Sequence, residues 1–197
     1  MVPRQVGKTM PISVTGTRFH GVVILAPKRF RDGRGFFQET WSRRDLHEVG
    51  IDVDFVQDNQ SYSEHVWTVR GLHVQAPPHA QDKLVRCIRG AILDVVVDVR
   101  QGSESYGHWL SFELSRENGF QLFVPKGFLH GFLTLQPDTE IVYKCSDYYS
   151  STAEVSVRWD SVGIDWPISG APILSQKDAS AIPLSEFQSP FILGVNS

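Results

Sequence analysis

The chain contains little of two residue types that would indicate other classes of protein. Of its 197 residues, two are cysteines and two are methionines. Cys87 and Cys145 lack the CxxC spacing of a redox or metal site and lie in apolar runs, where a free thiol packs as a small hydrophobic group. The first twenty residues also lack the apolar segment of a secretory signal. We therefore expect two buried, reduced thiols and a cytoplasmic location.

An excess of either charge and a long apolar run are also missing. The 19 Lys and Arg residues oppose 22 Asp and Glu residues, which gives a net charge of -3. No block of basic residues suggests nucleic-acid binding, and no stretch approaches the ~20 apolar residues of a membrane-spanning helix. Basic residues that bind an anion must therefore act locally, and neither nucleic acid nor membrane is an expected partner.

Helical periodicity is scarce, and the apolar runs are short, rich in Val, Ile, Phe and Leu, and bounded by Gly, Pro, Asp and Ser. This pattern predicts a mainly β fold with few short helices. Strands are predicted at 21–25, 54–57, 83–88, 91–99, 109–114, 121–124 and 140–145. A helix with Ser42 as its cap is predicted at 41–49, and a short helical turn near 174–179. Residues 1–197 are predicted to form one domain, with a barrel core at about 50–150, N-terminal strands and a C-terminal wrapping segment.

The most informative motif lies between Gly119 and Phe132. A glycine ends one strand, Pro125 and Gly127 shape a turn, and the next strand carries His130. This spacing resembles the second signature of a cupin-type double-stranded β-helix, which is a jelly-roll barrel. In such a barrel the histidine points into the interior, so we expect His130 to lie in a cavity.

The first signature of a cupin, normally His-x-His followed by a carboxylate, is altered here. The corresponding positions hold His73, Gln75 and Lys83. A neutral amide binds metal weakly and a protonated amine repels it, whereas zinc or iron sites need three or four suitable ligands. We therefore predict a barrel without a metal, in which the remaining chemistry is proton transfer.

Residues 91–100 alternate in character, which places Asp94, Val96, Asp98 and Arg100 on one face of a strand. We interpret this face as the lining of a wet cavity, with Asp94 as the best candidate. Asp98 and Arg100 could equally end an exposed strand.

Several side chains could carry acid–base chemistry. An isolated histidine is often a core residue, but the paired signatures favour His73 and His130 as cavity residues, and a histidine held by a carboxylate is a good general base. Asp178 could supply that carboxylate if the C-terminal segment folds back. Lys83 either stabilises an oxyanion or is a solvated strand residue.

Two further groups are open to two interpretations each. The three tyrosines Tyr143, Tyr148 and Tyr149 could donate a proton into a cavity or serve as core and rim residues. Arg34 stands in a glycine-rich segment before two phenylalanines, a combination that suits a nucleoside diphosphate but also an ordinary surface turn.

The chain as a whole resembles the dTDP-4-dehydrorhamnose 3,5-epimerase family. The matching blocks are 32–39, 55–59, 70–73, 81–85, 94–100, 125–132, 143–149, 159–160, 163–167 and 174–178. The resemblance implies an isomerase that acts on a dTDP-4-keto sugar without a cofactor, as in L-rhamnose biosynthesis.

The resemblance also implies roles for individual residues. His73 would be the base, oriented by Asp178, with Tyr148 as the proton donor across the sugar ring and Lys83 near the 4-keto oxygen. The implied nucleotide-binding positions are Arg34, Glu39, Gln57, Asn59 and Arg70, and His130 and Asp94 match polar residues of the pocket. The family also implies a homodimer in which the Arg34 loop reaches the neighbouring site.

Three alternatives follow from the same residues. Relatives that invert only carbon 3 or only carbon 5 share the fold and the base. A non-catalytic sugar-binding cupin would have the same pocket without a working base and acid. A metal-dependent cupin oxygenase would need better ligands than Gln75 and Lys83.

Overall fold

The protein consists of 13 named β-strands and three short helices within the described residues, which are 12–16, 19 and 21–195 of this computed structural model. The other residues of the predicted 1–197 domain lie outside the described residues. The strands are β1 (Ile12–Gly16), β2 (Val23–Pro27), β3 (Arg29–Asp32), β4 (Gly35–Gln38), β5 (Gln57–Ser63), β6 (Val69–Gln75), β7 (Lys83–Arg89), β8 (Ala91–Asp98), β9 (Trp109–Ser115), β10 (Gln121–Val124), β11 (Phe128–Thr134), β12 (Thr139–Cys145) and β13 (Glu154–Ser156). The helices are α1 (Arg43–Glu48), α2 (Gln176–Ala179) and the 3₁₀ helix η1 (Leu184–Glu186).

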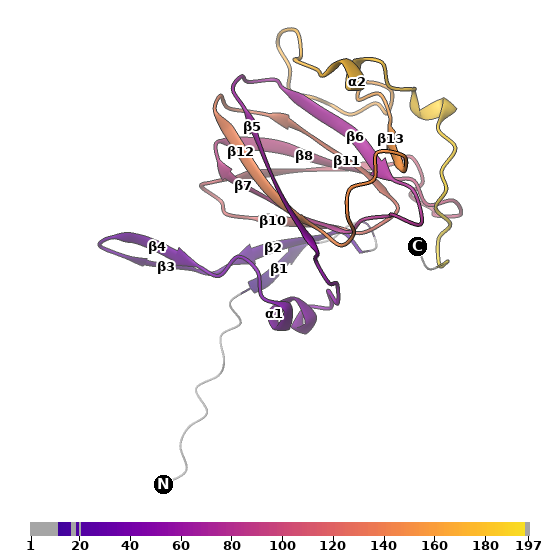
Figure 1. Cartoon of the computed structure of the whole chain (residues 1–197). Helices are drawn as coiled ribbons and strands as arrows, with labels where there is room; N and C mark the ends of the chain where they lie inside the picture. Colours follow the sequence, from indigo (N-terminus) through magenta and orange to yellow (C-terminus); the bar gives the residue numbers. More distant parts are fainter. Residues whose placement is uncertain (1–11, 17–18, 20, 196–197) are drawn as a thin grey trace.

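Two antiparallel sheets face each other and form the barrel (Figure 1). The first has the order β1-β2-β10-β7-β12-β5, and the second has the order β13-β6-β11-β8-β9. Neighbours within each sheet are mostly distant in sequence, as in a jelly roll. The predicted cupin-type fold is confirmed.

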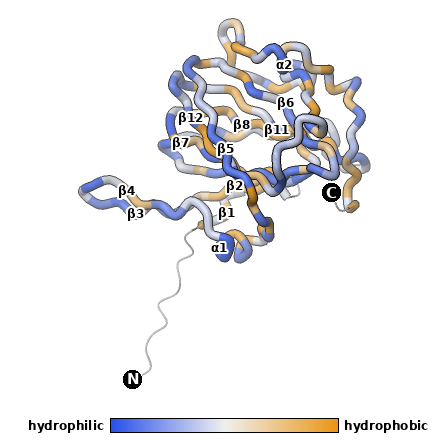
Figure 2. Tube along the Cα trace, viewed as in Figure 1, coloured by the Kyte–Doolittle hydropathy of each residue, from blue (hydrophilic) through white to orange (hydrophobic). Residues whose placement is uncertain are grey.

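Three apolar clusters hold the layers together, and apolar segments in Figure 2 follow the strands of both sheets. The first cluster lies between the sheets and includes Val85 and Ile141 from one sheet and Val96 from the other. The second lies on the outer face of the five-stranded sheet, where the C-terminal segment covers Val95 and Val97. The third packs α1 against the outer face of the six-stranded sheet. Strand β8 is therefore buried on both faces.

The burial of β8 corrects the prediction of a wet polar face. Val96 belongs to the core between the sheets. Asp98 is fully buried, and its carboxylate accepts hydrogen bonds from Arg100, Ser103 and Ser105 at 2.6–2.9 Å. Asp98 thus closes the turn after the strand, because three local donors compensate its burial.

Most predicted elements are confirmed within a few residues, including α1 with Ser42 as its N-cap. The strand predicted at 54–57 is wrong, since the strand β5 begins at Gln57. Its sequence, QDNQSYS, is almost entirely polar, and partly buried positions alternate with exposed ones. A search for alternating apolar residues does not detect such a polar strand. Its inner face borders a polar cavity, so it needs no apolar side chains there.

The hairpin of β3 and β4 extends away from the barrel as an arm (Figure 1). Phe30, Phe36 and Phe37 on this arm are exposed, and Phe37 keeps 69% of its surface accessible. In contrast, the C-terminal segment lies along the barrel, where Ile173 pairs with Thr68 and Ile182 pairs with Val157. None of the helices in the described part of the chain is long and apolar enough to cross a membrane.

Candidate active site

A cavity of about 460 Å³ opens between the two sheets near the C-terminal segment. Five predicted site residues line it, namely Arg70, His73, Lys83, His130 and Asp178. The other lining residues are Ser61, Thr68, Val69, Phe132, Ile141, Tyr143, Glu154, Ile173, Leu174, Ser175 and Lys177. The structure thus brings together residues from the six strands β5, β6, β7, β11, β12 and β13 and from the wrapping segment.

Two glycines bring the histidine strands β6 and β11 close together. A Cβ on Gly71 would lie 2.7 Å from Gly131 Cα, and one on Gly131 would lie 2.8 Å from the carbonyl oxygen of Arg70. Gly71 also has a φ of +119°, which disfavours any other residue. The close packing sets His73 directly opposite His130 across the antiparallel pair.

The wrapping segment places a carboxylate on His73. The distance from His73 Nε2 to Asp178 Oδ1 is 2.6 Å, and Ser175 Oγ donates to Asp178 Oδ2 at 2.8 Å. Burial alone would raise the pKa of Asp178, but the bond and charge of His73, together with Ser175, outweigh it and lower that pKa. Asp178 therefore stays ionised and can stabilise an imidazolium on His73.

A second histidine–carboxylate pair stands beside the first. His130 Nε2 lies 2.7 Å from Asp94 Oδ1, and the Asp94 side chain is completely buried. Asp94 is not among the residues that line the cavity, and it reaches the cavity only through His130. Its predicted place on a wet face is therefore wrong, because the Asp94 side chain is completely buried and paired with His130.

Lys83 projects from β7 into the same cavity and is strongly desolvated. Burial lowers the pKa of its ammonium, although the nearby Cys145, Glu154 and Asp94 oppose the shift. A desolvated ammonium interacts strongly with an oxyanion, since little water competes with it.

Tyr143 lines the cavity, whereas Tyr148 does not. Tyr148 keeps 64% of its surface exposed, and its carbonyl oxygen accepts a hydrogen bond from Gln75. Tyr143 is half-buried in β12, and burial raises the pKa of its phenol. The physical reason is strand alternation, which turns residues 141, 143 and 145 inward while Tyr148 lies beyond the end of β12. That alternation is the signal in the sequence that points to Tyr143.

The five predicted nucleotide-binding residues are spread more widely. Arg70 lines the cavity, and its guanidinium donates to Ser63 Oγ and to the Tyr62 carbonyl oxygen. Gln57 donates to Asn59 at 2.9 Å, and both lie on the same face of β5 as Ser61, which lines the cavity.

Arg34 and Glu39 lie elsewhere. Arg34 sits at the turn of the arm, where 92% of its side chain is exposed and Asp32 pairs with it at 2.6 Å. Glu39 directly follows the second strand of the arm. Neither residue lines the cavity of its own chain.

Two charged residues of the cavity were missed by the sequence analysis. Lys177 Nζ lies 2.5 Å from Glu154 Oε2, which also accepts a hydrogen bond from the Tyr149 hydroxyl at 2.8 Å. Burial would raise the pKa of Glu154, but the bonds from Lys177 and Tyr149 outweigh it and lower that pKa. No sequence pattern indicates this pair, because it joins the edge strand β13 to α2 through tertiary packing.

Among the described residues, no group of three or more His, Cys, Asp or Glu side chains could hold a metal ion. Gln75, at a ligand position of the cupin signature, instead donates to the carbonyl oxygens of His79 and Tyr148. Its own carbonyl oxygen accepts from the backbone of Ser150. These contacts fix a loop and leave no free donor atom of Gln75 for a metal.

A carboxylate-held imidazole, a desolvated ammonium and a phenol with a raised pKa thus surround one cavity of a cupin barrel. This combination defines a cupin-type isomerase that transfers protons beside a carbonyl group.

The particular family follows from comparison with known proteins. Residues 16–186 match the family described as dTDP-4-dehydrorhamnose 3,5-epimerase, and the chain belongs to this family. A dTDP-4-dehydrorhamnose 3,5-epimerase of Sinorhizobium fredii is 49% identical over 172 residues, which span 86% of this chain and 88% of the relative.

Two solved structures are informative. The dTDP-6-deoxy-D-glucose-3,5-epimerase of Legionella pneumophila, in complex with dTDP-4-keto-L-rhamnose, has a TM-score of 0.86 and 39% identity, covering 90% of this chain and 95% of that one. A 3'-monoepimerase of Streptomyces bikiniensis, solved as a double mutant in complex with dTDP, has a TM-score of 0.82 and 32% identity, covering 86% of each chain. Its two substitutions change a histidine and a tyrosine that are 70 positions apart.

Proposed function

We propose that this isomerase inverts carbons 3 and 5 of dTDP-4-dehydro-6-deoxy-D-glucose to give dTDP-4-dehydro-L-rhamnose, with His73 as the general base. The observation that carries the proposal is the 2.6 Å contact between His73 and Asp178 beside the ammonium of Lys83 in one cavity. The complex of the Legionella relative with dTDP-4-keto-L-rhamnose supports the same substrate class.

The reaction follows from the chemistry of the 4-keto group. This group acidifies the hydrogens on the two adjacent carbons, so neutral His73 can remove one and become an imidazolium that Asp178 stabilises. The electron pair moves to the keto oxygen, where the ammonium of Lys83 stabilises the enolate. Reprotonation from the opposite face then inverts the carbon.

We assign the acid of the second step to Tyr143 in place of Tyr148. Tyr143 lines the cavity, and its raised pKa keeps the phenol protonated at neutral pH. The separation of His73 and Tyr143 is 70 positions, the same as that of the histidine and tyrosine changed in the Streptomyces relative. Both facts support a base and an acid on opposite faces of the sugar.

The nucleotide end of the substrate requires a second set of residues. Arg70 can donate to the diphosphate from the cavity rim, and the inner face of β5 offers the amides of Gln57 and Asn59. Arg34 and Glu39 lie on or beside the arm, which extends away from the barrel, so they do not reach the cavity of their own subunit. We therefore propose a homodimer in which the arm of one subunit completes the site of its partner, and the exposed phenylalanines of the arm support such a contact.

The unpaired thiols of Cys87 and Cys145 support a cytoplasmic location.

The decisive test is solvent deuterium incorporation into dTDP-4-dehydro-6-deoxy-D-glucose, followed by NMR. We expect exchange at carbons 3 and 5 with the native chain and a loss of exchange by roughly 10²–10⁴-fold with His73→Asn. Lack of exchange with the native chain would refute the substrate, and undiminished exchange with the variant would refute the base.

The same experiment separates a second candidate function. The Streptomyces relative is a 3'-monoepimerase, so the shared groups are compatible with inversion of a single centre. Exchange confined to one carbon would assign that activity to this chain.

A further inference from the structure

We infer that Arg29 is a positioning residue that clamps the β3–β4 arm to the turn between β9 and β10. The clamp fixes the direction in which Arg34 is presented to the partner subunit. This inference rests on the proposed dimer and deepens it, because it names the side chain that holds the arm in its working orientation.

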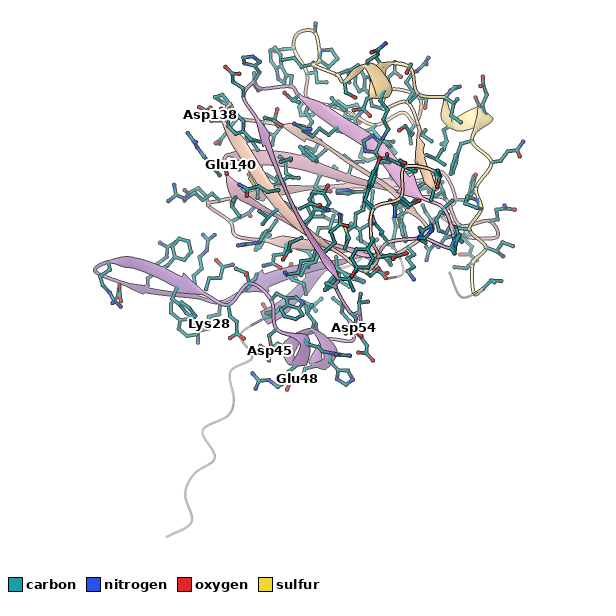
Figure 3. All side chains as sticks on the ribbon, in the orientation of Figure 1. Lys28, Asp45, Glu48, Asp54, Asp138 and Glu140 are labelled. Carbon is teal, nitrogen blue, oxygen red and sulfur yellow. The ribbon has the colours of Figure 1, made fainter. Side chains whose placement is uncertain are left out.

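Arg29 makes three polar contacts at the base of the arm. Its Nη1 donates to the carbonyl oxygen of Glu117 at 2.7 Å and its Nη2 to that of Arg116 at 2.6 Å. Its Nε donates to Gln38 Oε1 at 2.8 Å, which ties the first strand of the arm to the second. The neighbouring Lys28, labelled in Figure 3, marks the position of this base on the fold. One guanidinium therefore joins both strands of the arm to the barrel.

The body of the protein is shaped to receive this guanidinium. Gly119 has a φ of +65°, and a Cβ on it would lie 2.4–2.8 Å from atoms of the Arg29 guanidinium. The guanidinium also lies over the Phe36 ring, with Arg29 Cζ 4.6 Å from the ring centroid. A lysine could not reproduce this arrangement, since its single ammonium lacks the planar fork of three donor nitrogens.

The arm needs such a clamp because of its construction. It is a two-stranded hairpin, and a hairpin of this kind has marginal stability by itself. Its phenylalanines are exposed in the subunit, so the apolar faces of Phe30 and Phe37 do not anchor it to the barrel. Without the guanidinium, the arm would take several orientations at the partner's site, and substrate binding would have to select the working one.

The test uses heterodimers purified through two different affinity tags. Pairing a His73→Asn subunit with an Arg34→Ala subunit leaves one native site, made by His73 of the second subunit and the arm of the first. We expect about half of the wild-type kcat per dimer and a wild-type KM, because a two-fold dimer carries two equivalent sites. Each parent homodimer should be impaired.

Arg29→Ala is then added to one subunit at a time. On the His73→Asn subunit, whose arm serves the native site, we expect KM to rise roughly tenfold with kcat unchanged, because binding must now order the arm. On the Arg34→Ala subunit, whose arm serves the defective site, the KM of the native site should stay unchanged. This asymmetry distinguishes a positioning role from a general loss of stability.

Arg31→Ala is the matched control, since Arg31 lies on the same strand with its Cζ 5.7 Å from the Phe36 ring. It should leave KM unchanged on either subunit. An equal effect of Arg29→Ala on both subunits, or no effect on either, would overturn the inference. If the heterodimer of the His73→Asn and Arg34→Ala subunits is inactive, the arm does not serve the partner's site, and the inference fails with it. An inactive wild-type protein would instead refute the proposed function.

Discussion

Two tyrosines five positions apart occupy different environments. Tyr143 is half-buried beside Lys83 and Arg70 at the cavity, and its pKa is raised mainly by burial. Tyr148 lies on an exposed loop. A phenol that remains protonated and lines the cavity is suited to donate a proton there, whereas a phenol exposed on a loop is not placed to do so.

The first prediction separates these tyrosines. Tyr143→Phe should lower kcat by roughly 10²–10⁴-fold, because the proposed general acid is removed while the ring still fills its place. Tyr148→Phe should change kcat by less than about threefold, since it removes an exposed hydroxyl. Steady-state epimerisation assays with both variants measure this difference. A large loss with Tyr148→Phe and a small one with Tyr143→Phe would reverse the assignment.

The second prediction concerns Lys83. Burial lowers the pKa of its ammonium from the ordinary 10.5. Lys83 therefore loses the positive charge that would stabilise the enolate as the pH rises through this lower pKa. Tyr143 has a raised pKa and titrates later. We expect kcat to decline on the alkaline side at a pH below 10.5, and this decline should persist in Tyr143→Phe.

Lys83→Arg is the complementary variant, because a guanidinium keeps its charge throughout this range. Its kcat will be lower overall, but the alkaline decline should be absent. An unchanged decline in Lys83→Arg would assign the titration to another group.

At the scale of elements, the α2 segment does more than wrap the barrel. Asp178 reaches His73 from this four-residue helix, whose N-cap Ser175 also bonds the carboxylate. A single turn of helix cannot hold a position by itself. The pair formed by Glu154 and Lys177 joins it to β13, which lies next to the histidine strand β6.

The third prediction tests this link. Glu154→Gln should accelerate amide hydrogen exchange at residues 174–179 by roughly fivefold, the equivalent of about 1 kcal/mol for a partly exposed ion pair. It should lower kcat by a similar factor, because Asp178 is held less firmly. Arg158→Gln, which removes the exposed pair with Asp160, provides the control and should change neither quantity. Unaltered exchange in Glu154→Gln would contradict the proposed link.

At the scale of the whole molecule, stability depends on a buried carboxylate far from the chemistry. Burial would raise the pKa of Asp98, but bonds from Arg100, Ser103 and Ser105 outweigh it and lower the pKa from 3.8 to about 2. A carboxylate whose pKa is lower in the folded protein than in the unfolded chain stabilises the fold at pH values above its unfolded pKa. This stability is lost as the pH falls through the pKa of the folded state.

The fourth prediction follows from this sign. Asp98→Asn should lower the free energy of unfolding at pH 7 by about 2 kcal/mol, because a neutral amide cannot make the charge-assisted bonds that lower the pKa of Asp98. The difference from the native chain should narrow between pH 3.8 and about 2. Urea unfolding at several pH values measures it, and a difference independent of pH would exclude the linkage.

The sequence predicts the fold better than it predicts the site. The spacing of Gly119, Gly127 and His130 reports local backbone shape, so it reveals the barrel without tertiary information. Asp178 is a candidate in the sequence only if the C-terminal segment folds back, the resemblance then implies its role, and the structure brings it to His73. The resemblance points to Tyr148 and not to Tyr143 as the proton donor. The choice between them depends on which residues of β12 face the cavity and on where that strand ends.

Other features escape sequence patterns for physical reasons. The pairing of Glu154 with Lys177 depends on where an edge strand meets the wrapping segment, and nothing in the local sequence records that contact. The polar strand β5 was misplaced, since its inner face meets a cavity and not the core. Functional surfaces violate the apolar alternation on which the prediction of strands relies.

The origin of the Asp178 carboxylate has a consequence for synthesis on the ribosome. His73, Lys83 and Tyr143 emerge from the ribosome well before residue 178, so the barrel can form around the proposed base before its carboxylate partner is available. The same late segment covers Val95 and Val97. A nascent or proteolytically clipped chain that ends before this segment would therefore lack the carboxylate that pairs with His73 and would expose an apolar sheet face, which makes it a target for chaperones and proteases.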